Sequence, residues 1–446
     1  MDQKFLCGAS VQDITPTNDM LPMSRGTLGS GFVGVVDPLR IRAIALDDGT
    51  RKVLLVSFDL GAAPDPIKNV PLISKHTGIP EDNIFLFGTH AHAAPMVGRI
   101  GPTGPMTRPN PEIQAVMERY EKYLYAAMYK AIDCALADMR PAKVGSATGK
   151  SYINVNRNQD YVVTGENGER VEYCSLGFSA EGPSDKTLFV MRFDDSDGKP
   201  IAFFVNYPVH CVVMHANDCF NGAMGISGDI AGCVSGYMED MFEGAVAMWT
   251  SGAAGDQNPI MMNNIYYPDP ETGKFNSDTV NGGDTYILRV LSTRHFADIQ
   301  RVLEKIDSVS DDIKLDVIVD WSLTPGRDLE PLDPANPIMG GSRVIENPNA
   351  APYDVRLQML KIGNTALLGI SGELYTSFGL HLKEISPLKD IVIVTHCSSH
   401  MTRAGYIYDD DGIARKALHY GNSRILPGYV KDSLSQTMLR MFDSIL

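Results

Sequence analysis

Cysteine is scarce in this sequence, and its placement argues against a fold held together by disulfides. The seven cysteines are odd in number, and no two of them form a Cys-x-x-Cys pair. They are scattered along 446 residues as Cys7, Cys134, Cys174, Cys211, Cys219, Cys233 and Cys397. Small secreted domains space their cysteines as a framework, whereas cytosolic proteins keep scattered thiols reduced. We therefore expect free thiols and a cytoplasmic protein.

Basic residues and long apolar runs are also in short supply. The chain has 39 Lys and Arg against 54 Asp and Glu, a formal net charge of −15, and no Lys- or Arg-rich stretch. This balance argues against nucleic acid as a partner. The N-terminal sequence MDQKFLCGASVQDITP contains no apolar signal-peptide core, and no later run reaches membrane-spanning length. We therefore expect an unsecreted protein without a transmembrane segment.

Several familiar catalytic signatures are missing. The sequence contains no HExxH, no GxSxG and no GxxxxGK[ST] P-loop. A His-x-His pair is present at His90 and His92, but Ala-Ala-Pro follows it, so the HxHxDH signature of metallo-β-lactamase folds fails. In TIM-barrel amidohydrolases the His-x-His pair lies on the first strand, and the later ligands of that class are not evident here. These absences leave metal chemistry of another kind open.

The chain does have regularly spaced apolar runs, and these predict the fold class. Runs at 52–58 and 83–88 flank a helical stretch at 65–76, which is the order of a βαβ unit and predicts a parallel strand pair. Residues 111–139 have helical periodicity, with Asn110 as N-cap and Pro111 in the first turn. Further apolar runs lie at 188–193, 201–206, 245–250, 366–371 and 391–395, and further helical stretches at 229–242, 284–306 and 374–386. We predict one α/β domain over residues 1–446, with mixed, largely parallel sheets flanked by helices.

Polar side chains follow these apolar runs at the points where the runs stop. In open α/β sheets, ligands bind beyond the carboxyl ends of the strands. The residues in this position are Asp59, His90, His92, His210, Asp256, Asn258, Glu373, His396 and His400. Taken singly, each histidine is better explained as an ordinary buried or exposed residue. Taken together, histidines and carboxylates at several strand ends favour zinc or another divalent transition metal, and hence a metal hydrolase.

An ordered set of motifs then resembles one family, the neutral/alkaline (non-lysosomal) ceramidases. The family's early DIT segment is similar to ASVQDITP (9–16), and its THTHSGPGG motif to THAHAAPMVG (89–98). Its NINRSP turn resembles INVNRNQ (153–159), and its histidine before ISGD resembles NYPVHC (206–211) and GISGD (225–229). GDVSP is similar to GDQNP (255–259), GEFT to GELYT (372–376), and GYVTT…YEG to GYIYD (405–409) and HYG (419–421). The likeness covers nearly the whole chain in the family's order.

The resemblance implies a site and a reaction. Zinc is expected on His90, His210, Glu373 and Tyr406, with water completing the site. His92, Arg157 and Tyr420 are expected to contact the substrate, and the GDQNP turn adds Asp256 and Asn258 to the catalytic set. Asp59 or Asp229 is the expected acceptor behind a ligand imidazole. The implied reaction is cleavage of an N-acyl amide by metal-activated water.

The chain departs from the family pattern at three points. Asn258 stands where the family has a serine, and an amide is no nucleophile, which favours a water-based mechanism. Residues 93–97, Ala-Ala-Pro-Met-Val, replace SGPGG beside the first histidines. The family's secretion signal and its C-terminal immunoglobulin-like domain are not expected here. The substrate is therefore ceramide or a more soluble N-acyl amine or amino sugar.

Two other functions stay open at this level. A metal-dependent esterase or phosphatase would use the same water, and a non-catalytic homologue would only bind a ligand or partner. Two long polar segments, 264–284 and 323–352, are candidates for lids over the site or for arms of a homo-oligomer.

Overall fold

The structure is a computed structural model of the whole chain. It describes residues 5–24, 31–97, 99–101, 104–105, 110–164, 167–268, 275–279, 284–306, 309–331, 342–345, 347–397, 405–417, 423–426 and 428–446. No helix within these residues is long and apolar enough to cross a membrane.

Two sheets form the centre of the fold. The larger has eight strands, in the spatial order β15 (Val246–Ser251), β13 (Pro200–Tyr207), β12 (Thr187–Asp195), β9 (Arg140–Lys150), β1 (Leu6–Asp13), β4 (Arg40–Asp47), β5 (Lys52–Phe58) and β6 (Ile84–Gly88). The smaller has four, in the order β19 (Leu315–Thr324), β22 (Tyr353–Ile362), β23 (Thr365–Ile370) and β25 (Asp390–Val394). Apolar side chains of both sheets share one buried cluster, so the sheets pack face to face.

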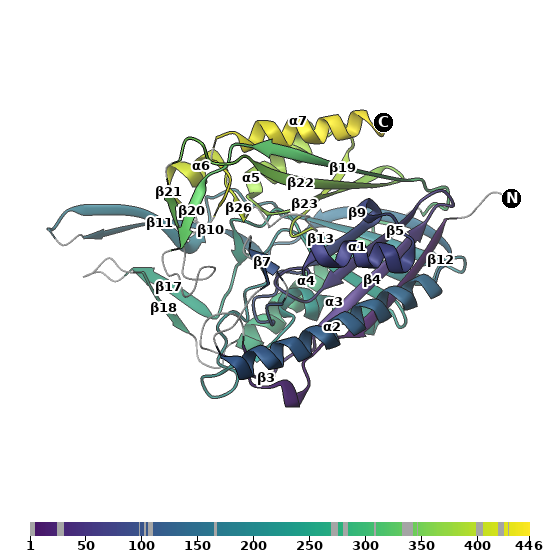
Figure 1. Ribbon diagram of the computed structural model, residues 1–446, viewed down its shortest axis with the longest axis horizontal. Coiled ribbons are helices and arrows are strands. Elements are labelled where there is room, and N and C mark those ends of the chain that lie inside the picture. The colour runs from purple at the N-terminus through teal and green to yellow at the C-terminus, as the bar shows by residue number, and fades with distance from the viewer. Residues whose placement is uncertain are drawn as a thin grey trace.

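Helices cover the outer face of each sheet, which gives four layers (Figure 1). The helices on the eight-stranded sheet are α1 (Pro66–Thr77), α2 (Pro111–Ala137), α3 (Asp229–Met241) and α4 (Asp284–Leu303). Those on the four-stranded sheet are α5 (Thr376–Ile385) and α7 (Val430–Asp443). In β5, Val53 and Leu55 face the second sheet while Leu54 and Val56 face the helices. This burial of both faces explains why the strand reads as an unbroken apolar run.

The predicted mixed α/β fold with flanking helices is confirmed, and so is the βαβ unit formed by β5, α1 and β6. Asn110 caps α2 by accepting from the backbone N–H groups of Glu112 and Ile113, as predicted. Parallel pairing is less frequent than expected. In the large sheet only β5–β6 and β13–β15 are parallel, and β23–β25 is the parallel pair of the small one.

The reason lies in the connections between strands. A helix lies between the two strands of each of the three parallel pairs, whereas tight turns join β4 to β5 and β12 to β13. Gly49 and Gly198 occupy these turns with positive φ of 87° and 80°. Such turns return the chain as an antiparallel neighbour. The sequence reading missed the partner strands β1, β4 and β9, and therefore overestimated parallel pairing.

Smaller elements surround the site. A three-stranded sheet has the order β11 (Arg170–Ser179), β10 (Asn154–Thr164) and β16 (Gln257–Pro259), and another has the order β14 (Met224–Ile226), β3 (Gly31–Val35) and β2 (Met23–Ser24). A short parallel pair joins β24 (Glu373–Leu374) to β26 (Tyr406–Ile407), and β7 (Arg99–Gly101) pairs with β8 (Gly104–Pro105). The described residues also include the helix α6 (Asp410–Ala414) and the 3-10 turns η1 (Asn18–Met20) and η2 (Glu81–Asn83).

The two long polar segments each contain a two-stranded ladder. These are β17 (Asn264–Pro268) with β18 (Phe275–Thr279), and β20 (Asp328–Pro331) with β21 (Ser342–Ile345). The β10–β11 and β17–β18 ladders project from the same end of the molecule, at the left of Figure 1. The centre of the second segment, PIMGG at 337–341, lies outside the described residues. A role of either segment as lid or oligomer arm stays a prediction.

Candidate metal centre

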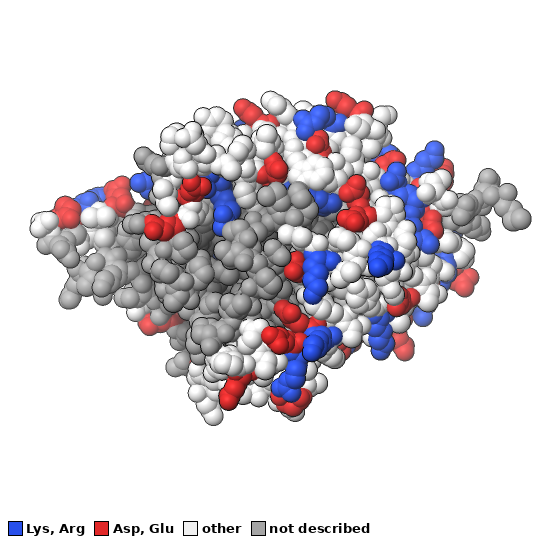
Figure 2. Space-filling model, in the orientation of Figure 1, with Lys and Arg blue, Asp and Glu red and all other residues white. Residues whose placement is uncertain are grey.

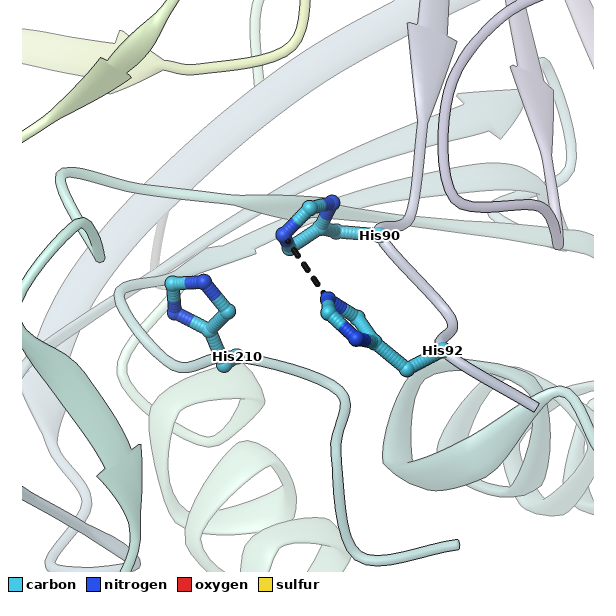
Figure 3. Close-up of side chains that lie close together, drawn as sticks. All are labelled: His90, His92 and His210. Atoms are coloured by element: carbon cyan, nitrogen blue, oxygen red, sulfur yellow. Dashed lines mark hydrogen bonds between the residues drawn. The ribbon is translucent and has the colours of Figure 1, made fainter. Parts of the chain in front are cut away.

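Five histidines from three segments of the chain meet in one place, and three of them are buried: His90, His210 and His396. His90 is the hub, with ring-centroid distances of 4.6 Å to His92, 4.7 Å to His210 and 3.9 Å to His396. His215 adjoins His92, with centroids 5.4 Å apart. Figure 3 shows His90, His92 and His210 converging from two loops. The convergence follows from the topology, because the three parallel strand pairs all end at this place.

His90 follows β6 in the left-handed backbone region, with a φ of 65°. Its Nδ1 lies 2.9 Å from the carbonyl oxygen of Gly61. A carbonyl oxygen can only accept, so Nδ1 carries the hydrogen of the neutral imidazole and Nε2 is available to the site. Nε2 lies 3.4 Å from Oε2 of Glu373. The positive φ is uncommon outside glycine, and such backbone often occurs at functional sites.

His210 follows β13 and is held in the same manner. Its backbone N–H and its Nδ1 both lie 3.1 Å from the carbonyl oxygen of Gln257. Nε2 lies 3.4 Å from Oε2 of Glu373. Burial and the nearby Arg157 guanidinium lower the pKa of His210 to about 3, so the ring is neutral at pH 7. A neutral imidazole with one nitrogen fixed by an acceptor is the form that binds metals.

Glu373 and Tyr406 come to the site together, since they are direct partners in the β24–β26 pair. Glu373 is buried, and its Oε2 lies 3.4 Å from Nε2 of His90 and 3.4 Å from Nε2 of His210. The Tyr406 hydroxyl lies 3.4 Å from Nε2 of His210. Burial and the Glu373 charge raise the pKa of Tyr406. A cation between these groups would reverse that effect and favour the phenolate.

The spacing of these atoms fits a tetrahedral metal ion. Zinc binds nitrogen and oxygen ligands at about 2.0–2.2 Å, which places neighbouring ligand atoms about 3.3–3.6 Å apart in a tetrahedron. Three such distances in the site are 3.4 Å. Oε2 of Glu373 is buried, and no hydrogen bond reaches it from the described residues. Buried carboxylate oxygens are normally satisfied, so this atom is the one that most needs a cation.

His92 lies closer to the surface than the four predicted ligands. Its Nε2 is 3.1 Å from Nε2 of His90, and its backbone N–H donates to the carbonyl oxygen of Cys211 at 3.0 Å. One donor atom from each of His90, His92 and His210 falls within 4.8 Å of the others, so distance alone also admits His92 as a ligand. The chain is not extended here, because His90 has positive φ. The rings of His90 and His92 therefore lie together because the chain turns between them, and not because they alternate along an extended strand.

Arg157 projects from β10 beneath Tyr406. Its Nη2 donates to the carbonyl oxygen of Gly255 at 2.7 Å and its Nη1 to Oδ1 of Asn258 at 3.3 Å. The guanidinium carbon lies 5.4 Å from the centre of the Tyr406 ring. Arg157 is thus buried within the site, and the neighbouring Tyr406 raises its pKa against the opposing effect of burial.

The GDQNP turn places its two predicted residues differently. Asn258 reaches the site, where it accepts from Arg157 and lies 3.1 Å from the Met262 sulfur through Nδ2. Asp256 accepts from the Thr376 N–H at 2.9 Å and from the Asn156 amide at 2.8 Å. Burial raises the pKa of Asp256 to about 6. The structure therefore shows Asp256 tying the turn to the start of α5.

The predicted acceptors behind the imidazoles are incorrect. Asp59 instead binds Arg42 at 2.9 Å and the backbone N–H of Arg40 at 3.0 Å. Asp229 accepts from the backbone of Met214 and Ile230. Backbone carbonyls of Gly61 and Gln257 hold His90 and His210, and a sequence does not reveal such acceptors. Tyr420 and His400 lie outside the described residues.

Sequence reasoning noted His396 after an apolar run but gave it no role, and it missed His215. His396 is buried, and one donor atom of its ring lies within 4.8 Å of those of His90 and Glu373. Its position directly after a strand of a parallel pair was the available signal. His215 follows no strand, so only the folded chain brings it to His92.

Figure 2 shows acidic and basic side chains mixed over the described part of the visible face. This mixture gives no reason to expect a highly charged partner on that face.

Comparisons with known proteins identify a family. Residues 5–285 match the family described as neutral/alkaline non-lysosomal ceramidase, N-terminal. The neutral ceramidase from Pseudomonas aeruginosa has a similar structure, with a TM-score of 0.70 and 17% identity over 99% of this chain and 74% of that one. A structure described as ceramidase complexed with C2 matches with the same score and identity, over 99% of this chain and 76% of that one. The chain belongs to the neutral/alkaline non-lysosomal ceramidase family, a family of enzymes that hydrolyse amide bonds.

Proposed function

We propose that this protein is a zinc-dependent amidohydrolase that cleaves the amide bond of an N-acyl substrate. The observation that carries the proposal is the donor set around Glu373, in which His90 and His210 each place Nε2 at 3.4 Å from the same carboxylate oxygen. Tyr406 completes the set from the strand beside Glu373. Two imidazoles and two anionic oxygens suit zinc better than magnesium or calcium, which prefer oxygen alone.

Zinc bound here would supply a Lewis acid and lower the pKa of a water molecule to about 7. The remaining work falls to the chain's own residues. His92 is half-buried beside the donor set, where its ring can donate a hydrogen bond to the amide oxygen as negative charge develops there. His90 and His210 are fixed by backbone carbonyls, so their geometry is set before substrate arrives.

Arg157 and Asn258 support Tyr406 in this proposal. Arg157 is anchored at both ends of its guanidinium fork, which holds the positive charge against the Tyr406 ring. That charge favours the anionic form of the phenol. Asn258 cannot form an acyl intermediate, and its two amide ends are engaged by Arg157 and Met262. The chemistry is therefore assigned to water, without a serine nucleophile.

The substrate is proposed to be ceramide or a more soluble N-acyl amine or amino sugar. Ala93 and Ala94, which directly follow His92, are buried in the hydrophobic core and stand where the family motif has a serine and a glycine. The surroundings of the first histidines therefore differ from the family motif, and a substrate other than ceramide is included in the proposal for this reason.

A substrate panel tests the proposal. Zinc-loaded protein is incubated with short- and long-chain ceramides, N-acyl amino sugars, and ester and phosphate analogues, and products are identified by mass spectrometry. We expect free amine and fatty acid from at least one amide, with no release by His210→Ala. Cleavage of esters or phosphates with no amide hydrolysed would refute the proposal.

A further inference from the structure

His396 joins the metal centre from the other sheet. It follows β25 of the four-stranded sheet, whereas His90 follows β6 of the eight-stranded one. Both residues have left-handed backbone, with φ of 55° and 65°. Their rings stack with centroids 3.9 Å apart and planes inclined by 21°. Two unusual backbone conformations thus serve a single contact between the layers.

The chain around His396 is fixed on both sides. Cys397 forms an isolated bridge with Phe87 of β6, and the backbone N–H of Thr395 donates to the carbonyl oxygen of Ser251 at the end of β15. His396 is buried. Backbone hydrogen bonds on both sides therefore fix the position of His396, and its ring covers one face of the His90 ring.

Stacking of this kind argues against His396 as a ligand to the same ion as His90. The lone pair of an imidazole nitrogen lies in the plane of the ring, so a bound ion lies close to that plane. Two rings with centroids 3.9 Å apart and planes inclined by only 21° cannot both hold one ion in the ring plane at about 2.0–2.1 Å from a nitrogen. His90, Glu373 and His396 lie close together, but His396 is therefore not expected to bind the same ion as His90.

We propose that His396 is a positioning residue that fixes the orientation of His90 as a metal ligand. The inference rests on the proposed zinc site. The carbonyl oxygen of Gly61 accepts a hydrogen bond from Nδ1 of His90, and the His396 ring packs against the face of the His90 ring. Together, these two contacts restrict rotation of the His90 side chain. Hydrogen-bond partners that orient a ligand imidazole typically contribute about 10–100-fold to metal affinity, and we expect an effect of the same order from a stacked ring.

Zinc affinity of the purified protein, measured by competition with a chromogenic chelator, tests this role. His396→Asn removes the ring and tolerates the left-handed backbone, and we expect it to bind zinc about 10–100-fold more weakly. His396→Phe keeps a flat ring against His90, and we expect an affinity within about threefold of wild type. His381→Asn is the matched control, since His381 lies on α5 and contacts Ser435 instead.

Two results would overturn the inference. One is unchanged zinc affinity in folded His396→Asn. The other is an equal loss in His396→Asn and His396→Phe, which would indicate that a nitrogen of His396 matters rather than its ring. X-ray absorption spectroscopy of zinc-loaded His396→Phe should show two imidazole ligands, the number expected for wild type. These readouts need no substrate, so failure of the amide hypothesis would leave them intact.

Discussion

Glu373 and Tyr406 face each other as partners in a two-strand parallel pair, and this pairing aligns two of the four predicted ligands. The backbone N–H of Glu373 donates to the carbonyl oxygen of Gly405 at 2.8 Å, and that of Tyr375 to Ile407 at 3.0 Å. Backbone hydrogen bonds therefore set the spacing of a carboxylate and a phenol from separate segments. The two histidines reach the same point from strands of the large sheet.

His92→Asn separates the two roles that distance alone allows for His92. If His92 faces substrate, the variant should retain about one zinc per chain while its kcat falls about 10²–10³-fold, the usual loss for one oxyanion donor. His210→Ala is the comparison and should lose the metal. Zinc content by elemental analysis and turnover of an identified substrate give the answer. Loss of zinc in His92→Asn would instead make His92 a ligand.

Gly255→Ala should disturb the centre through the backbone. A Cβ at Gly255 would lie 2.6 Å from the carbonyl oxygen of Glu373 and 2.8 Å from Cδ1 of Tyr375, so β24 must move. We expect weaker zinc binding and a loss of about 1–3 kcal/mol in the free energy of unfolding. Gly236→Ala is the control, because it meets nothing within 4 Å and lies in α3. The control should be neutral or stabilised by up to about 1 kcal/mol, and equal effects of both substitutions would contradict the account.

Arg157→Lys should destabilise the protein although the charge is kept. An ammonium cannot reproduce the planar fork that donates to both Gly255 and Asn258. Leaving a buried acceptor unsatisfied costs about 1–3 kcal/mol, which denaturant unfolding will detect. Arg440→Lys, at an exposed pair with Asp320, should remain within about 0.5 kcal/mol. An unchanged free energy of unfolding in Arg157→Lys would show that the planar guanidinium group is not needed.

Asp256→Asn should change how stability depends on pH. Burial raises the pKa of Asp256 from 3.8 to about 6, so the folded state holds its proton more tightly than the unfolded state. That stabilisation is complete below pH 3.8 and is lost as pH rises through about 6. Asn accepts at only one of the two positions where Asp256 accepts from Thr376 and Asn156, so the variant loses a hydrogen bond at every pH. Because Asn does not ionise, the stability of the variant relative to wild type should rise by up to about 3 kcal/mol as the pH increases from 4 to 7.

Asp185→Asn supplies a control of opposite sign. Although burial opposes it, Lys383 lowers the pKa of Asp185, so that carboxylate stabilises the fold above its unfolded pKa and the contribution fades as pH falls. Denaturant unfolding across the same pH range should show opposite trends for the two variants. Parallel trends would contradict the account of Asp256.

Apolar runs predicted most helices and core strands because both faces of those strands are buried. The run at 52–58 became β5, and the helix expected at 111–139 ends at Ala137. Partner strands were harder to see. Arg140–Lys150 contains four glycine or alanine residues and only three buried positions, so it shows no apolar run. The stacking of two sheets was likewise missed, since pairing between distant strands leaves no local pattern.

The candidate site was predicted from motif order rather than from spacing. His90, His210, Glu373 and Tyr406 do meet in the fold, which is what the resemblance implied. The acceptors behind them are backbone atoms, and a sequence carries no mark of which carbonyl will face a ring. His396 was visible as a residue after a strand, but its stacking on His90 depends on how two sheets pack.

The most direct test of the central claim is anomalous diffraction at the zinc edge from crystals of zinc-loaded protein. We predict one strong peak between Nε2 of His90, Nε2 of His210, Oε2 of Glu373 and the hydroxyl of Tyr406. A peak at another set of residues, or none at this place in protein shown to contain one zinc per chain, would contradict the account.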